Sequence, residues 1–99
     1  MTEDEALDLI LFNKPRELPQ EFRTKEFILK LINEHGLIID LDLFEYWGVE
    51  LDYDLILARE ISYYNTYHHP FDNLYRRYHN DLSVGEIDKL YTTLGLIVG

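Results

Sequence analysis

Four side chains that could bind a divalent metal ion lie close together in the sequence, namely His68, His69, Asp72 and His79. Imidazole and carboxylate groups are zinc ligands in many proteins. The spacing of these residues matches no known metal-binding motif, and the side chains of adjacent histidines usually point in different directions. We therefore interpret them as polar residues of a loop around Pro70, and we expect neither a metal site nor a cofactor.

Residues that could take part in catalysis are present, but no motif arranges them. Ser62 and Ser83 lack the G-x-S-x-G context of an activated serine, and Ser83 is better explained as the cap of a helix. The sequence contains neither a P-loop nor a G-x-G-x-x-G motif. A chain of 99 residues also rarely encloses the dry pocket that catalysis needs. We assign no catalytic residue and expect the protein not to be an enzyme.

Tyr75-Arg76-Arg77-Tyr78 contains residue types that bind nucleic acids, because arginine binds phosphate and tyrosine stacks on bases. Two arginines provide too little positive charge to bind nucleic acid in a chain whose net charge is −10. We therefore favour a structural role, in which Tyr75 and Tyr78 pack inward while Arg76 and Arg77 pair with nearby carboxylates. The negative charge disfavours direct binding to nucleic acids and to anionic membranes.

The most unusual pattern is a run of acidic residues between Lys30 and Arg59 with no Lys or Arg among them. Its members are Glu34, Asp40, Asp42, Glu45, Glu50, Asp52 and Asp54. Residues 1–13 are also acidic, whereas residues 14–30 are slightly basic. Such a field attracts a basic surface and gives fast, salt-sensitive association.

Aromatic residues gather in the same region of a chain that has eight tyrosines. Residues 44–67 contain Phe44, Tyr46, Trp47, Tyr53, Tyr63, Tyr64 and Tyr67. Tyr and Trp are frequent in interface hot spots, but they also form the cores of small domains, and the two interpretations can coexist. We predict that the partner-binding residues are Glu34, Asp40, Asp42, Glu45, Tyr46, Trp47, Glu50, Asp52, Tyr53 and Asp54.

Length and composition indicate one folded domain over residues 1–99. The chain is 46% hydrophobic, which argues against disorder, and it has no cysteine for disulfides or thiolate zinc sites. The N-terminal residues are acidic, unlike a secretory signal, and no apolar run approaches the roughly 20 residues that a membrane span needs. We expect a soluble protein of the cytoplasm, which is the host cell's cytoplasm if a phage encodes the protein.

Capping residues and apolar spacing predict an all-α fold, a compact irregular bundle of five or six short helices. Thr2 and Glu5 form a capping box for a helix over residues 3–12, which Asn13-Lys14-Pro15 ends. Thr24 caps a helix over residues 24–35, and Gly36 ends it.

Residues 37–43 are ambiguous, because their partial alternation suits a short strand whereas Asp40 could cap a helix. We favour the helix, running through Phe44 and Trp47 to Gly48. A longer helix follows over residues 52–67 and stops at His68-His69-Pro70.

Two helices are predicted in the remaining residues. The first is short, is capped by Asp72 and places Leu74, Tyr75 and Tyr78 on one face. The second covers residues 84–94, begins with the capping box of Ser83 and Glu86, and ends at Gly95.

These features favour a small acidic protein-binding module whose partner has a basic surface. The carboxylates would imitate the spacing of phosphates and block the basic groove of a nucleic-acid enzyme, such as a nuclease, a restriction enzyme or a CRISPR effector. In size and charge the chain resembles small phage inhibitors of this kind, including DNA mimics and anti-CRISPR proteins. That resemblance is one of class and not of sequence.

The alternative function is an assembly, scaffolding or chaperone-like phage accessory protein that binds its partner through an apolar surface. The apolar run Leu94-Gly95-Leu96-Ile97-Val98-Gly99 motivates this alternative.

Overall fold

A computed structural model describes residues 1–68 and 73–98 of the chain, and all regular elements in this part are helical. The predicted all-α fold is therefore confirmed for the described residues, which contain six α-helices. The chain divides into two compact units, Met1–Glu50 and Leu51–Gly99, and each is described by itself. That residues 1–99 form a single domain stays a prediction.

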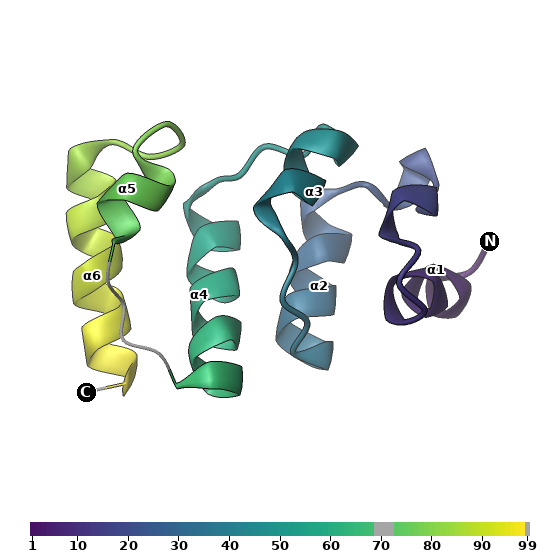
Figure 1. Cartoon of the computed structure of the whole chain (residues 1–99), viewed down its shortest axis with the longest axis horizontal. Coiled ribbons are helices and arrows are strands. Elements are labelled where there is room, and N and C mark those ends of the chain that lie inside the picture. The colour runs from purple at the N-terminus through teal and green to yellow at the C-terminus, as the bar shows by residue number, and fades with distance from the viewer. Residues whose placement is uncertain (69–72, 99) are drawn as a thin grey trace. The chain divides into compact units, whose positions relative to one another are not determined.

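The first unit contains three α-helices and two short 3₁₀ turns (Figure 1). In chain order these are α1 (Glu3–Leu11), η1 (Pro15–Glu17), η2 (Gln20–Phe22), α2 (Lys25–His35) and α3 (Leu41–Trp47). The turn η1 packs against both α1 and α3. Pro15 is the first residue of η1, where the fixed φ of proline suits the start of a helix. Leu18, which precedes Pro19, has ψ 124° and so lies outside the helical region.

Local capping explains where α1 and α2 begin and end. The Thr2 hydroxyl accepts a hydrogen bond from the Glu5 N–H, and the Glu5 carboxylate accepts one from the Thr2 N–H, which completes the predicted capping box. Thr24 caps α2 by accepting from the Phe27 N–H at 3.2 Å. Gly36 ends α2 at φ 62°, a left-handed conformation that glycine adopts without strain.

The segment that the sequence left ambiguous is the helix α3, preceded by irregular residues 37–40, and the alternative strand is not present there. Asp40 occupies the N-cap position but makes no side-chain capping hydrogen bond. Gly48 ends the helix at φ 71°. The interior of this unit is built from Ala6, Leu18, Phe27, Ile28, Leu31, Ile32, Ile39, Phe44 and Trp47.

The second unit contains α4 (Tyr53–Tyr67), α5 (Leu74–Tyr78) and α6 (Val84–Val98). In Figure 1, α4 and α6 lie side by side and run in the same direction, with α5 packed against α6. Its buried apolar residues are Leu55, Ile56, Ala58, Leu74, Tyr78, Leu82, Ile87, Leu90 and Leu94. The predicted capping box of α6 is confirmed, because Ser83 and Glu86 each accept a hydrogen bond from the other's N–H.

Two details predicted for this unit are wrong. The last helix does not end at Gly95 but continues to Val98, and Gly95 is not among the residues with positive φ. Tyr75 does not pack inward with Tyr78: its side chain is 54% exposed, whereas Tyr78 is completely buried. In a helix this short, the residues four apart, Leu74 and Tyr78, share the buried face. The predicted cap Asp72 lies outside the described residues, and α5 begins after Asn73.

Candidate protein-binding surface

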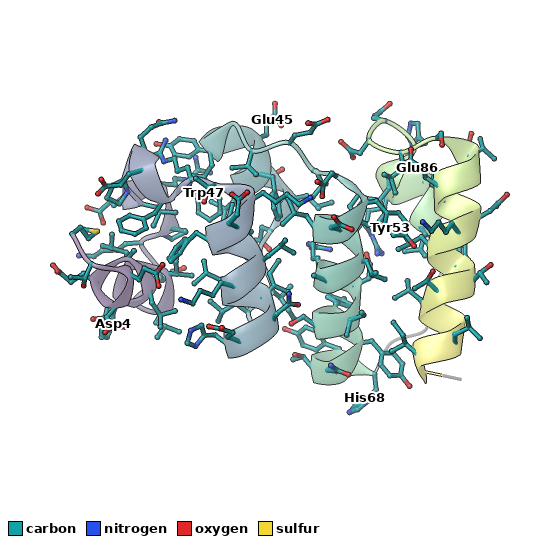
Figure 2. All side chains as sticks on the ribbon, turned by 180° about the vertical axis from the view of Figure 1, so that it is seen from behind. Asp4, Glu45, Trp47, Tyr53, His68 and Glu86 are labelled. Atoms are coloured by element: carbon teal, nitrogen blue, oxygen red, sulfur yellow. The ribbon has the colours of Figure 1, made fainter. Side chains whose placement is uncertain are left out.

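The helix α3 presents acidic side chains on one face and buries aromatic side chains on the other. Asp42 and Glu45 are three residues apart, so they project from the same side of the helix, and both are exposed. Phe44 and Trp47 have the same spacing on the opposite side and are buried. Figure 2 shows Glu45 pointing away from the ribbon. The short helix therefore anchors itself through two rings and exposes its carboxylates.

Four predicted residues, Asp40, Asp42, Glu45 and Glu50, form what we call the α3 acidic face. All of them are exposed. Within the part of the chain that the structure describes, none of their carboxylates forms an ion pair or a hydrogen bond. No basic side chain of the described residues therefore neutralises these charges, and a basic partner can reach them.

Tyr46, at the edge of this face, is 48% exposed and lies beside two arginines of the slightly basic residues 14–30. The guanidinium carbon of Arg16 is 4.6 Å from the centroid of the Tyr46 ring, and that of Arg23 is 5.5 Å away. Both distances allow cation–π attraction. Arg23 is held by its own backbone contacts, since its Nε donates to the Leu18 carbonyl at 2.7 Å. Tyr46 is thus accessible but already packed against arginine.

Trp47 does not belong to the accessible surface and has to be removed from the candidate site. Its side chain is 3% exposed, and its indole N–H donates to the Pro15 carbonyl at 2.9 Å. This hydrogen bond satisfies the polar end of a ring that is otherwise in the core.

Three predicted residues lie at the start of α4 in the second unit. Asp52 is the N-cap and accepts from the Leu55 N–H at 3.0 Å. Tyr53 is half-buried: its hydroxyl lies 3.1 Å from the Thr93 hydroxyl, and the Lys89 ammonium lies 4.9 Å from its ring centroid. Asp54 is exposed and sits in the first turn, where an acid complements the helix dipole. Asp52 and Tyr53 therefore both make contacts that stabilise their own unit.

Glu34 is an exposed residue near the end of α2, away from the α3 acidic face in sequence. It faces the same cavity as Lys30, together with Glu3 and Asp4 of α1. Glu34 was predicted to act with the later carboxylates, and Glu3 and Asp4 were not predicted as site residues. The structure instead gives Glu34 acidic neighbours from the N-terminal helix.

A buried polar cluster in the second unit was not foreseen. The Glu60 carboxylate, 2% exposed, accepts hydrogen bonds from the Tyr78 hydroxyl and, at 2.6 Å, from Arg77. Arg59 lies 3.7 Å from the same carboxylate oxygen and donates to the Tyr78 hydroxyl at 3.2 Å. Arg59 and Glu60 are the only charged residues between Asp54 and Asp72, and this isolation in an apolar helix was a signal that could have revealed the cluster.

The electrostatics of this cluster indicate a structural role. Burial first, and then the negative charge of Glu60, raise the pKa of Tyr78 far above its ordinary value of 10.0. Burial lowers the pKa of Arg77, but the charge and hydrogen bond of Glu60 outweigh it and leave that pKa raised. The tyrosine therefore stays neutral and the arginine charged. The predicted pairing of Arg77 with a carboxylate is confirmed, whereas Arg76 has no carboxylate partner among the described residues.

Among the described residues, no three His, Asp or Glu side chains lie close enough together to hold a metal ion. His68 ends α4 in a left-handed conformation at φ 56°, and the His79 Nδ1 lies 3.0 Å from the Arg76 carbonyl. His69 and Asp72, which the sequence grouped with them, lie outside the described residues.

Comparison with protein-family models, with curated proteins and with solved structures found no match to this chain. No helix in the described ranges, 1–68 and 73–98, is long and apolar enough to cross a lipid bilayer. Any function must therefore be argued from the side chains themselves.

Proposed function

We propose that the chain is a protein-binding module whose α3 acidic face engages a basic surface on a partner protein. The single observation that supports this proposal is that Asp40, Asp42, Glu45 and Glu50 are exposed together without an ion pair or hydrogen bond among the described residues. Most of the acidic residues behind the net charge of −10 also lie in residues 1–50. This long-range field steers a basic partner toward the first unit.

The partner class that fits this surface is a nucleic-acid enzyme with a basic groove, such as a nuclease, a restriction enzyme or a CRISPR effector. Carboxylates on a small helical surface can imitate phosphates, so the module blocks the groove against nucleic acid. Binding of this kind loses affinity as salt rises, because the attraction is between solvent-exposed charges. Tyr46 supplies short-range contact area beside the carboxylates.

The test compares three forms of the chain as bait in a lysate pull-down at low and high salt. The test variant combines Asp42→Lys, Glu45→Lys and Glu50→Lys. The control combines Asp8→Lys, Glu17→Lys and Glu21→Lys, which are also exposed residues of the first unit and make the same change in charge. Far-UV circular dichroism checks that all three forms keep their helices.

We expect the wild type and the control to retain the same nucleic-acid enzyme at low salt and to lose it at high salt. The test variant should not retain it, and double-stranded DNA should displace it from the wild type. The proposal would be contradicted if the test variant retained that enzyme, or if the test and control variants lost it to the same extent.

A second candidate function, an assembly or accessory module, is favoured by a separate observation on α6. Leu96 is 82% exposed and Ile97 is 52% exposed, although both are large apolar residues. Exposed apolar side chains of this kind often mark a contact with another protein. Replacing both with Gln should then abolish assembly with little dependence on salt. Val84→Gln, at an exposed position in the first turn of the same helix, is the control.

A further inference from the structure

A cavity of about 250 Å³ lies between α1 and α2 of the first unit. Apolar side chains that line it are Leu7 of α1 and Phe27 and Leu31 of α2. Phe27 and Leu31 are almost fully buried, at 8% and 1% exposed, so they form a floor. This volume is smaller than the roughly 300–1,000 Å³ of pockets for drug-sized ligands. It therefore suits one side chain better than a cofactor.

Charged groups surround this apolar floor. Glu3 and Asp4 come from the first turn of α1, and Lys30 and Glu34 come from α2. On each helix the lining residues recur at spacings of three and four, which places them on one face. Three carboxylates thus share the cavity with one ammonium group. The local field favours a cation.

The structure already places a cation there. The Lys30 ammonium lies 2.7 Å from the Glu3 carboxylate. The hydrogen bond and charge of Glu3 raise the pKa of Lys30, and the charges of Glu34 and, more weakly, Asp4 raise it further. The side chains of the pair are 45% and 57% exposed, so the contact is a weak surface salt bridge that an incoming cation can displace.

We propose that this cavity receives the side chain of an arginine from the basic partner, an inference that rests on the proposed protein-binding function. The aliphatic stem of the arginine lies over Leu7, Phe27 and Leu31, and its guanidinium meets the carboxylates of Glu3, Asp4 and Glu34. Arginine suits the site better than lysine because its planar group offers five N–H donors and is more weakly hydrated. Lys30 acts as the resident competitor.

The test follows the ¹⁵N-labelled full chain by two-dimensional NMR. The first probe is N-acetyl-arginine amide, and its control is N-acetyl-citrulline amide, which has nearly the same shape without the charge. The second probe is a nona-arginine peptide, added at low salt. We expect saturable shifts of backbone amides around Leu7, Lys30 and Glu34 with the arginine probe and none there with the citrulline probe.

Two matched pairs of variants test the charges of the site. Lys30→Met removes the resident cation, and Lys14→Met makes the same change at an exposed position that does not line the cavity. We expect Lys30→Met to bind the arginine probe about two- to fivefold more tightly than Lys14→Met, the range expected when a surface salt bridge no longer competes. Glu34→Gln should weaken binding, whereas Glu21→Gln should leave it nearly unchanged.

The outcomes separate this inference from the proposed function. Equal shifts with arginine and citrulline, or equal affinities of the two lysine variants, overturn the cavity as an arginine receptor. Shifts by nona-arginine that are confined to the α3 acidic face overturn the cavity while the proposed function stands. If nona-arginine shifts no amide of the first unit at low salt, both ideas fall.

Discussion

At the scale of single residues, buried side chains with polar groups are distinguished by the hydrogen bonds that those groups make. Trp47 and Tyr78 show this, because each buries an aromatic ring and also hydrogen-bonds its polar end. Glu60 shows the converse, since a carboxylate that is 2% exposed requires several donors around it. Asp42 and Glu45 have no such internal partner among the described residues and are therefore available to another molecule.

Adjacent arginines allow a matched test of the buried cluster. Arg77→Met removes the donor 2.6 Å from Glu60 and leaves that carboxylate less satisfied. We expect a loss of about 1–2 kcal/mol in the free energy of unfolding, toward the low end for charged pairs because Arg77 is partly exposed. Arg76→Met should change stability by less than about 0.5 kcal/mol. Urea denaturation measures both, and equal effects would contradict the role assigned to Arg77.

The raised pKa of Tyr78 makes stability depend on alkaline pH. Above pH 10.0, the ordinary pKa of tyrosine, the unfolded chain releases this proton while the folded chain keeps it. The folded state therefore loses stability as pH rises, by up to about 1.4 kcal/mol per pH unit.

Tyr78→Phe should be less stable than the wild type at neutral pH, because it loses the hydrogen bonds to Glu60 and from Arg59. The gap between the two proteins should narrow above pH 10, since the variant lacks this titration. Tyr75→Phe, which changes an exposed tyrosine on the same helix, serves as the control. A gap that stays constant from neutral to alkaline pH would show that Tyr78 titrates normally.

At the scale of elements, backbone conformation gives the glycines opposite roles. Gly48 ends α3 with φ at +71°, a region in which a side chain is strained. Gly95 lies inside α6, and among the described residues a methyl group added there would meet no atom within 4 Å beyond its own stretch of helix. The same substitution should therefore act in opposite directions at the two positions.

We expect Gly95→Ala to stabilise the protein by about 0.5–1 kcal/mol, because alanine loses less backbone entropy in a helix. Gly48→Ala should destabilise it by about 1–2 kcal/mol through left-handed strain. Thermal and urea unfolding of the two variants provide the comparison. A destabilising effect of Gly95→Ala would mean that α6 does not continue past Leu94 in solution.

At the scale of the whole molecule, the predicted single domain requires the two units to unfold together. Each unit contains only about half of a chain that is itself near the lower end of domain size, and such small cores are marginal alone. The single tryptophan, Trp47, reports on the first unit. Arg77→Met perturbs the second unit.

We therefore predict that Arg77→Met lowers the urea midpoint followed by Trp47 fluorescence as much as the midpoint followed by far-UV circular dichroism. Coincident transitions are the standard sign of two-state unfolding. If Trp47 fluorescence keeps its wild-type midpoint while the dichroism curve shifts, then the units unfold independently and the chain has two domains.

The sequence by itself determined the helical class and most helix ends. Thr2, Thr24 and Ser83 were identified as caps, and Gly36 and Gly48 as terminators, because these depend on hydrogen bonds and dihedral angles within a few residues. The wrong prediction that the last helix ends at Gly95 also came from a local signal. Glycine is tolerated inside a helix as well as after one, so its presence does not by itself mark an end.

Tertiary structure alone decided which side chains are buried in the core and which remain accessible to a partner. Sequence spacing could not tell Trp47 from Tyr46 as an interface residue, or Tyr75 from Tyr78 as a core residue. The burial of Glu60 and the cavity between α1 and α2 depend on residues far apart in the chain. Burial is a property of what packs against a residue from elsewhere, so it could not be derived from local pattern. The acidic character of the candidate surface could therefore be predicted from the sequence, but the residues that form it could not.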